Sequence, residues 1–158
     1  MSRIVLVHWH EREAAERADR LAAAGHEVLV HWRQDEGGKS DALRSLTESP
    51  PDAVVIDLQR LPSHGNAIAT WIRSRKITRN LPLVFVPGDE VKTEVVRARF
   101  PDAMFAAWSR LPTALQRAIA TPPKTPVVPK GPDYSGTPLW KKLGVKADAR
   151  VALVRAPK

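Results

Sequence analysis

The feature that most constrains the fold is the alternation of five short apolar runs with five helical segments over residues 1–121. The apolar runs are rich in β-branched residues, which is typical of strands covered on both faces. They occupy residues 3–7, 26–32, 52–58, 81–86 and 103–108. The segments that favour helices are residues 11–25, 40–49, 65–76, 88–100 and 112–120. We therefore predict an α/β domain, a flavodoxin-like (βα)5 doubly wound parallel sheet with helices on both faces.

The rest of the chain differs in composition. Five prolines lie between residues 122 and 132, and such a stretch forms an extended, semi-rigid linker rather than a helix. The residues beyond it are too few to bury a core alone. We expect one α/β domain over residues 1–121, a Pro-rich linker over 122–133, and a short C-terminal tail over 134–158 that could be a second domain cut short.

The positive charge belongs mainly to this tail. The whole chain has a formal net charge of +8, yet residues 1–121 carry 17 Lys and Arg against 15 Asp and Glu. Residues 122–158 carry 8 against 2. A basic tail fits a nucleic acid, an acidic partner, or simple solubility.

Several classes of site and location are excluded or disfavoured. The chain has no cysteine, which excludes disulfides, thiolate catalysis and cysteine zinc sites, and fits a reducing compartment. No apolar run approaches the roughly 18 residues of a membrane helix, and the start "MSRIVLVHWHE" lacks the features of a signal peptide. No phosphate-binding glycine loop follows the first run, and no nucleophile elbow is present. We expect a cytoplasmic protein without membrane contact.

Asp57 is the first candidate site residue. It ends the third apolar run and begins the loop "DLQRLPSHG", at the carboxyl edge of the sheet where open α/β sheets bind ligands. The loop resembles the D-x-x-x-P-x-x-x-G loop of receiver domains of bacterial response regulators, with Pro62 displaced by one position. "LPLVFV" before Pro87 resembles the fourth strand of that family. The resemblance covers residues 1–121 and implies two-component signalling, with Asp57 as the phosphoacceptor.

The other family positions depart from the pattern. The family places an acidic pair after the first strand, a Thr or Ser after the fourth, and a Lys at the end of the fifth. The residues at or near these places here form a degenerate pocket: His8, Trp9, Glu11, Pro87, Gly88, Trp108 and Arg110.

Because of these departures, the chain lacks groups that aspartyl phosphorylation requires. Mg²⁺ requires oxygen ligands, and phosphoryl transfer requires positive charge on the equatorial oxygens. We therefore interpret Asp57 as a remnant, in a non-enzymatic pseudo-receiver without a cofactor that acts through protein contacts. By family analogy its contact surface is residues 89–120, with another protein or a second copy of the chain as the partner.

Two alternatives stay open. The first is a working phosphoacceptor that uses Asp57, Glu11 and Arg110 with Mg²⁺. The second is a nucleic-acid-binding protein that acts through its basic tail. "WIRSRKITR" and "WKKLGVK" place basic residues beside a tryptophan, as backbone contact and base stacking require, although a solvated basic face explains them too. The basic residues are Arg73, Arg75, Lys76, Arg79, Lys141, Lys142 and Lys146.

Histidines and tryptophans also gather near the predicted edge. His8, His10 and His64 could supply imidazoles to a metal, but residues two apart on a strand face opposite ways, so we predict no metal site. Trp9 and Trp108 stand near positions that receivers give to charged residues, and either plug the pocket or pack as ordinary core.

The tail carries a resemblance of its own. "YSGTPLWKKLGVKADARVALVRAP", from residue 134, resembles the start of a small bacterial domain family of unknown function. That resemblance implies no chemistry.

Overall fold

The computed structural model describes residues 1–32 and 41–130. The predictions for the tail, including Lys141, Lys142 and Lys146, lie outside these residues. So does Ser40, the first residue of the second helical segment.

Ten helices and strands and one 3-10 turn follow one another in the described residues. They are β1 (Arg3–Val7), α1 (Glu11–Ala23), β2 (Glu27–His31), α2 (Asp41–Glu48), β3 (Ala53–Asp57), α3 (Pro62–Ser74), β4 (Leu83–Val86), α4 (Glu90–Arg99), β5 (Met104–Phe105), the 3-10 turn η1 (Trp108–Arg110) and α5 (Leu111–Ala120).

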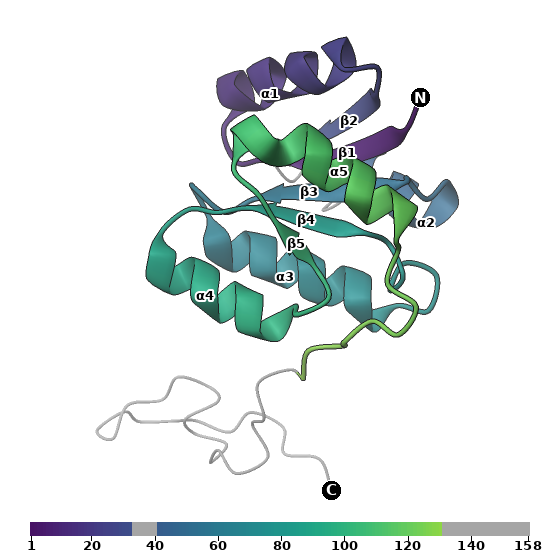
Figure 1. The fold of residues 1–158 in the computed structure, drawn as a ribbon, viewed down its shortest axis with the longest axis vertical. Helices are drawn as coiled ribbons and strands as arrows, with labels where there is room; N and C mark the ends of the chain where they lie inside the picture. Colours follow the sequence, from purple (N-terminus) through teal and green to yellow (C-terminus); the bar gives the residue numbers. More distant parts are fainter. Residues whose placement is uncertain (33–40, 131–158) are drawn as a thin grey trace, which may run out of the picture.

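The strands form one five-stranded sheet with the order β2-β1-β3-β4-β5. All four pairings are parallel, and helices cover the sheet on both sides (Figure 1). This order is that of the flavodoxin-like doubly wound fold, so the predicted fold class is confirmed. The carboxyl ends of β1, β3 and β4 meet at one edge, which carries the candidate site.

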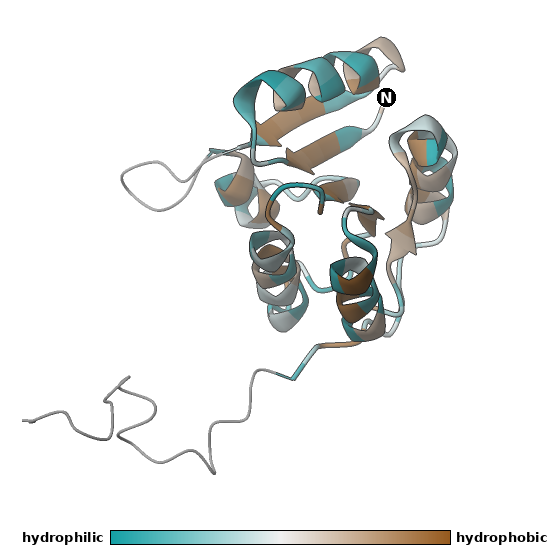
Figure 2. Cartoon of the chain, turned by 90° about the vertical axis from the view of Figure 1, so that its left-hand side faces the viewer, coloured by the Kyte–Doolittle hydropathy of each residue, from teal (hydrophilic) through white to brown (hydrophobic). Residues whose placement is uncertain are grey.

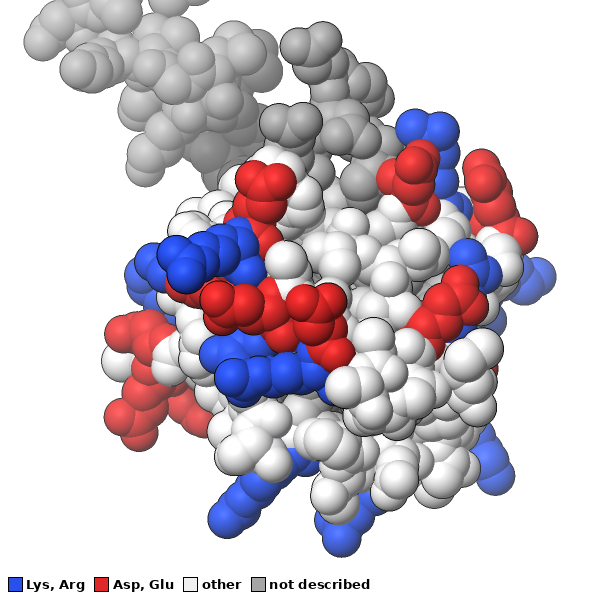
Figure 3. Space-filling view, turned by 90° about the horizontal axis from the view of Figure 1, so that it is seen from above, with Lys and Arg blue, Asp and Glu red and all other residues white. Residues whose placement is uncertain are grey.

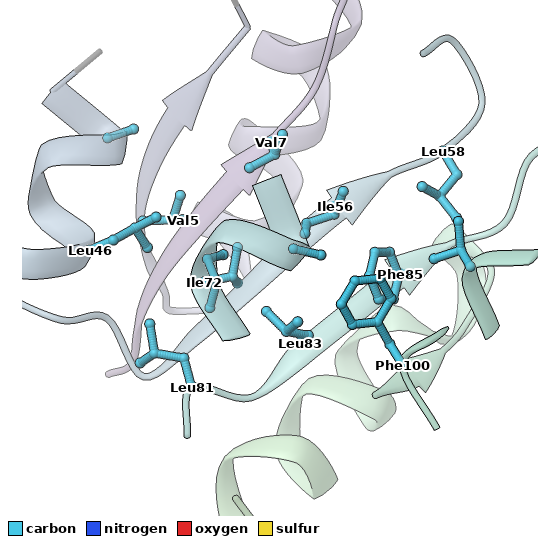
Figure 4. Close-up of a cluster of buried hydrophobic side chains, with 14 residues drawn as sticks. Val5, Val7, Leu46, Ile56, Leu58, Ile72, Leu81, Leu83, Phe85 and Phe100 are labelled. Atoms are coloured by element: carbon cyan, nitrogen blue, oxygen red, sulfur yellow. The ribbon is translucent and has the colours of Figure 1, made fainter. Parts of the chain in front are cut away.

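Two apolar clusters bury the faces of the sheet. One packs α2, α3 and α4 on side chains such as Val5, Ile56 and Phe85, as Figure 4 shows. The other packs α1 and α5 on Ile4, Val55 and the opposite face. Figure 2 shows hydrophobic strands flanked by helices with hydrophilic outer residues. Because both faces are covered, β3 is buried along its whole length, as its apolar sequence requires.

The helix ends follow local sequence signals. His10 caps α1 by accepting the Glu13 N–H, and Asp89 caps α4 by accepting the Lys92 N–H at 3.0 Å. Gly25 follows α1 with φ of 90°, a left-handed conformation that glycine adopts without a Cβ penalty.

Two elements differ from the sequence prediction. Helix α3 begins at Pro62 rather than at residue 65, because proline suits the first helical turn, where a missing N–H costs nothing. Strand β5 ends at Phe105, and Trp108 lies in the turn η1 rather than in a strand. The ladder stops once the Ala106 N–H has bonded the Phe85 carbonyl at 3.0 Å, which frees the chain to turn.

Residues 121–130 form no helix or strand. The Asn80 side chain holds the start of this segment by donating to the carbonyl of Pro123 at 2.8 Å. None of the helices in the described ranges is long and apolar enough to cross a membrane.

Candidate functional site

Asp57 lies fully buried at the carboxyl end of β3. Its Oδ1 atom accepts the backbone N–H of Gln59 at 2.7 Å. Its Oδ2 atom accepts the indole Nε1–H of Trp108 at 3.0 Å. Both carboxylate oxygens therefore have neutral donors from the protein itself, which is what a buried carboxylate needs to be tolerated.

Trp108 reaches Asp57 because the chain turns after β5. The turn η1 places the indole at the sheet edge, and the Arg17 guanidinium of α1 lies 4.7 Å from the centre of its ring. This cation–π contact holds the outer face of the half-buried indole. Trp108, which stands in the sequence near the position where the receiver pattern has a lysine, is thus a direct partner of Asp57.

His8 follows β1 and is 1% exposed. Its Nδ1 atom accepts the backbone N–H of His10 at 3.1 Å, so the proton of the neutral ring is on Nε2. Nε2 lies 3.7 Å from Asp57 Oδ2 and 3.7 Å from Glu13 Oε2. Burial lowers the pKa of His8, and the two carboxylates oppose that effect only in part.

Glu13, rather than Glu11, is the second carboxylate at this edge. His10 caps α1, which places Glu13 at the third helical position and turns it toward His8. Glu13 pairs with Arg60 of the β3–α3 loop, and the hydrogen bond from Arg60 lowers the pKa of the Glu13 carboxyl. Glu11 is exposed. Our sequence reasoning missed Glu13 and Arg60, because several acidic residues share the first turns of α1 and only the helix start selects one of them.

Pro87 follows β4, and Gly88 after it brings the β4–α4 loop close to the β3–α3 loop. A Cβ atom at Gly88 would lie 2.8 Å from Gln59 Cα and would also overlap the Leu58 carbonyl. The Gly88 N–H donates to the Thr93 hydroxyl at 3.2 Å. Gly88 is therefore needed for the close approach that positions Gln59, the backbone donor to Asp57.

The other candidates are not brought to Asp57. Arg110 is exposed and lines a separate hollow between β5 and α5. His64 packs edge-on against Trp9, with 5.0 Å between the ring centres, while His10 is a helix cap. Within residues 1–32 and 41–130, no group of three or more potential ligands could hold a metal ion.

The basic residues at the end of α3 do not form one face. Arg73 is fully buried, with Nη2 2.8 Å from Asp102 Oδ2 and Nη1 donating to the carbonyls of Arg79 and Leu81. The prediction that Arg73 belongs to an exposed basic surface is therefore wrong. Its contacts instead join α3 to the segments before β4 and β5. Burial lowers its pKa, and Asp102 opposes that effect.

Arg75, Lys76 and Arg79, the other residues of the predicted basic contact surface in this segment, are exposed. On a different part of the surface, the side that carries α1, acidic and basic side chains are interleaved, as Figure 3 shows. That face therefore presents no continuous basic track for a nucleic acid.

Solved receiver domains share this fold. One is the receiver domain of a signal transduction histidine kinase from Syntrophus aciditrophicus, with a TM-score of 0.58 and 20% identity over 76% of this chain and 91% of that chain. A receiver protein from Sinorhizobium medicae has a TM-score of 0.58 and 22% identity over 75% and 94%. The receiver domain of a sensor histidine kinase from Pseudomonas aeruginosa, which holds a magnesium ion in its active-site cleft, has a TM-score of 0.57 and 19% identity over 76% and 98%.

No family model and no curated protein matches the sequence. At these identities the solved structures show the fold, and the predicted receiver fold is confirmed. Whether Asp57 accepts a phosphoryl group is a separate question, which depends on the residues around it.

Proposed function

We propose that this domain is a non-catalytic pseudo-receiver that works in signal transduction through protein contacts. The observation that carries the proposal is the pair of hydrogen bonds on Asp57, from Trp108 to Oδ2 and from Gln59 to Oδ1. With both oxygens bonded and no exposed surface, the carboxylate acts as a structural acceptor that fixes the loops around it.

The residues at the edge do not fit the magnesium ion of a working receiver. Mg²⁺ requires near-octahedral oxygen ligands, and His8 stands where the family pattern supplies carboxylates. The nearby carboxylate of Glu13 is paired with Arg60. The indole N–H of Trp108 is a neutral donor, so it cannot neutralise a phosphoryl group as an ammonium does.

The phosphoacceptor alternative has less support. It required Glu11 and Arg110 beside Asp57, and both are exposed residues outside the contacts that surround this carboxylate. Any phosphoryl donor would also have to displace Trp108 from Oδ2.

The interaction surface follows from family analogy and covers residues 89–120. In support of a contact role, α4 exposes two valines one turn apart, Val91 at 74% and Val95 at 56%. Adjacent exposed aliphatic side chains are a feature of protein-binding surfaces.

Intact-mass measurement after incubation with Mg²⁺ and acetyl phosphate tests the proposal. We expect no gain of a phosphoryl group, either in the wild type or in the Asp57→Ala control. A gain in the wild type that the control lacks would make the protein a phosphoaccepting receiver. A Trp108→Lys variant restores the ammonium group of the family pattern. It tests whether the missing cation alone prevents phosphorylation, or whether the missing metal ligands prevent it too. We expect this variant to stay unmodified as well.

A further inference from the structure

A hollow of about 540 Å³ lies beside the open edge of β5. We infer that it binds an acidic segment of another protein, which inserts an apolar side chain between two arginines. This inference rests on the proposed interaction function and names the chemistry of the partner. The hollow is lined by Met104, Phe105, Ala106, Arg110, Thr113, Ala114 and Arg117.

The floor of the hollow is apolar and rigid. Met104, Phe105 and Ala106 come from β5 and the residue after it, and Ala114 comes from α5. The Phe105 ring packs in the cluster on the opposite face of the sheet, where it stacks on the fully buried Phe85 with 5.0 Å between the ring centres, and this contact anchors β5 beneath the hollow. A preformed apolar pocket of this kind receives an anchoring side chain at little conformational cost.

The sides of the hollow are cationic. Arg110 and Arg117 line it, and no lining residue is acidic. Within residues 1–32 and 41–130, neither arginine has an ion pair. By contrast, Arg97, whose guanidinium lies 4.2 Å from the centre of the Phe105 ring, is paired with Glu94 at 2.9 Å. Unpaired guanidinium groups beside an apolar floor match carboxylates that flank an apolar anchor.

Charge also argues against the two occupants that the chain itself could supply. Residues 122–158 carry 8 Lys and Arg against 2 Asp and Glu, and a segment of that net charge is a poor match for a site lined by Arg110 and Arg117. Only a two-fold contact centred on the hollow itself would bring the arginines of one copy close to those of the other, because residues near the two-fold axis meet their own counterparts. We therefore take an acidic segment of a different protein as the occupant, and the homodimer predicted as an alternative partner is an outcome of the test below.

The Asp57 site holds one wall of the hollow in place. Trp108, bonded to Asp57, and Arg110 belong to the same 3-10 turn. The buried carboxylate thereby positions a cation of the binding surface without any chemical step.

The experiment uses the full chain and the dye 1-anilinonaphthalene-8-sulfonate, an apolar anion that matches the hollow. We expect fluorescence enhancement with the native protein. Three decapeptide pools that contain equal shares of apolar residues then compete for the site, one acidic, one neutral and one basic. We expect the acidic pool to displace the dye at a concentration at least about tenfold lower than the neutral or the basic pool needs. The neutral and basic peptides lack the two charge contacts with the arginines, and this loss accounts for the difference.

Reversing the charge of the two arginines tests whether the dye and the peptides bind at the hollow. The double variant Arg110→Glu, Arg117→Glu is expected to weaken both the dye and the acidic pool by at least about tenfold. The matched control Arg12→Glu, Arg20→Glu makes the same change of charge on α1 and should leave both unchanged. Thermal unfolding of each variant checks that it is folded.

Each contrary result overturns the inference. These results are absence of dye binding, equal competition by the neutral or basic pool, or equal weakening by the α1 control. A dimer in sedimentation velocity that the Arg110→Glu, Arg117→Glu variant dissociates would identify a second copy as the occupant. A phosphorylated Asp57 in the mass measurement would contradict the proposed function but would leave the peptide result to be judged by itself.

Discussion

At the scale of single residues, the buried carboxylate of Asp57 is tolerated because a neutral hydrogen-bond donor contacts each of its two oxygens. Asp57 has one backbone donor and one indole donor, and the uncharged ring of His8 lies beside it. In a working receiver pattern the same position faces a metal ion and an ammonium group. Here the charge is stabilised by fixed dipoles instead, which is consistent with a permanent structural role.

The Trp108→Phe variant measures the indole contribution. Phenylalanine keeps most of the apolar contact but leaves Asp57 Oδ2 without that donor, so we expect a loss of about 1–3 kcal/mol in the free energy of unfolding. Urea denaturation measures it. In an Asp57→Ala background the same change should cost much less, and equal costs in both backgrounds would show that the hydrogen bond contributes nothing.

His8 predicts a dependence of stability on pH. Its pKa in the folded state lies below the ordinary value of 6.5 because burial outweighs the attraction of Asp57 and Glu13, while Arg17 and His10 act in the same direction as burial. The unfolded chain therefore binds a proton at higher pH than the folded chain does. Stability from this residue is present above about pH 6.5 and is lost as the pH falls below it, by up to about 1.4 kcal/mol per pH unit.

The His8→Asn variant tests this effect. Asparagine does not titrate, and its side-chain oxygen can replace Nδ1 as the acceptor for the His10 N–H. We expect a shallower fall in the free energy of unfolding between pH 7 and pH 5 than in the wild type. An unchanged slope would mean that His8 takes up its proton equally in both states.

At the scale of elements, the loops after β1, β3 and β4 and the turn after β5 build the site together. The β4–α4 loop packs against the β3–α3 loop at Gly88, and α1 contributes Glu13 and Arg17. The position of each side chain therefore depends on a loop that belongs to another βα unit.

Alanine substitutions at Gly88 and Gly65 compare how much stability depends on the close packing at each glycine. At Gly88 a new Cβ would overlap backbone atoms, whereas at Gly65 its close contacts would be two side-chain methyl groups, Ile56 Cγ2 and Leu58 Cδ2, both at 2.9 Å. Backbone cannot rotate away, so Gly88→Ala should cost about 1–3 kcal/mol and should cost more than Gly65→Ala. Thermal unfolding of both variants decides the order, and a larger loss for Gly65→Ala would refute the packing argument.

At the scale of the whole molecule, the buried ion pair between Arg73 and Asp102 joins segments that are far apart in the sequence. Arg73 links α3 to Asp102, just before β5, and to the carbonyls that lead into β4. Together with the two apolar clusters, it holds β5 and the surface beside it in register with the rest of the sheet.

The fold was predictable from the sequence because its signals are local. Alternating apolar runs and helical segments select a parallel α/β sheet, and residues such as Gly25 and Asp89 mark element ends whatever lies far away in the chain. The position of Asp57 at the carboxyl edge followed from its place at the end of β3.

The contacts of the site were decided by the tertiary structure. The sequence could not show that Trp108 donates to Asp57, since 51 residues separate them and the register after β5 depends on where the ladder ends. The choice of Glu13 over Glu11 depends on where α1 starts and on Arg60, 47 residues away. Arg73 looks like a surface cation in sequence, and only the packing of α3 against the turn before β5 buries it. Local patterns determine which elements form, whereas the partners of a buried polar group depend on how elements remote in the chain meet in space.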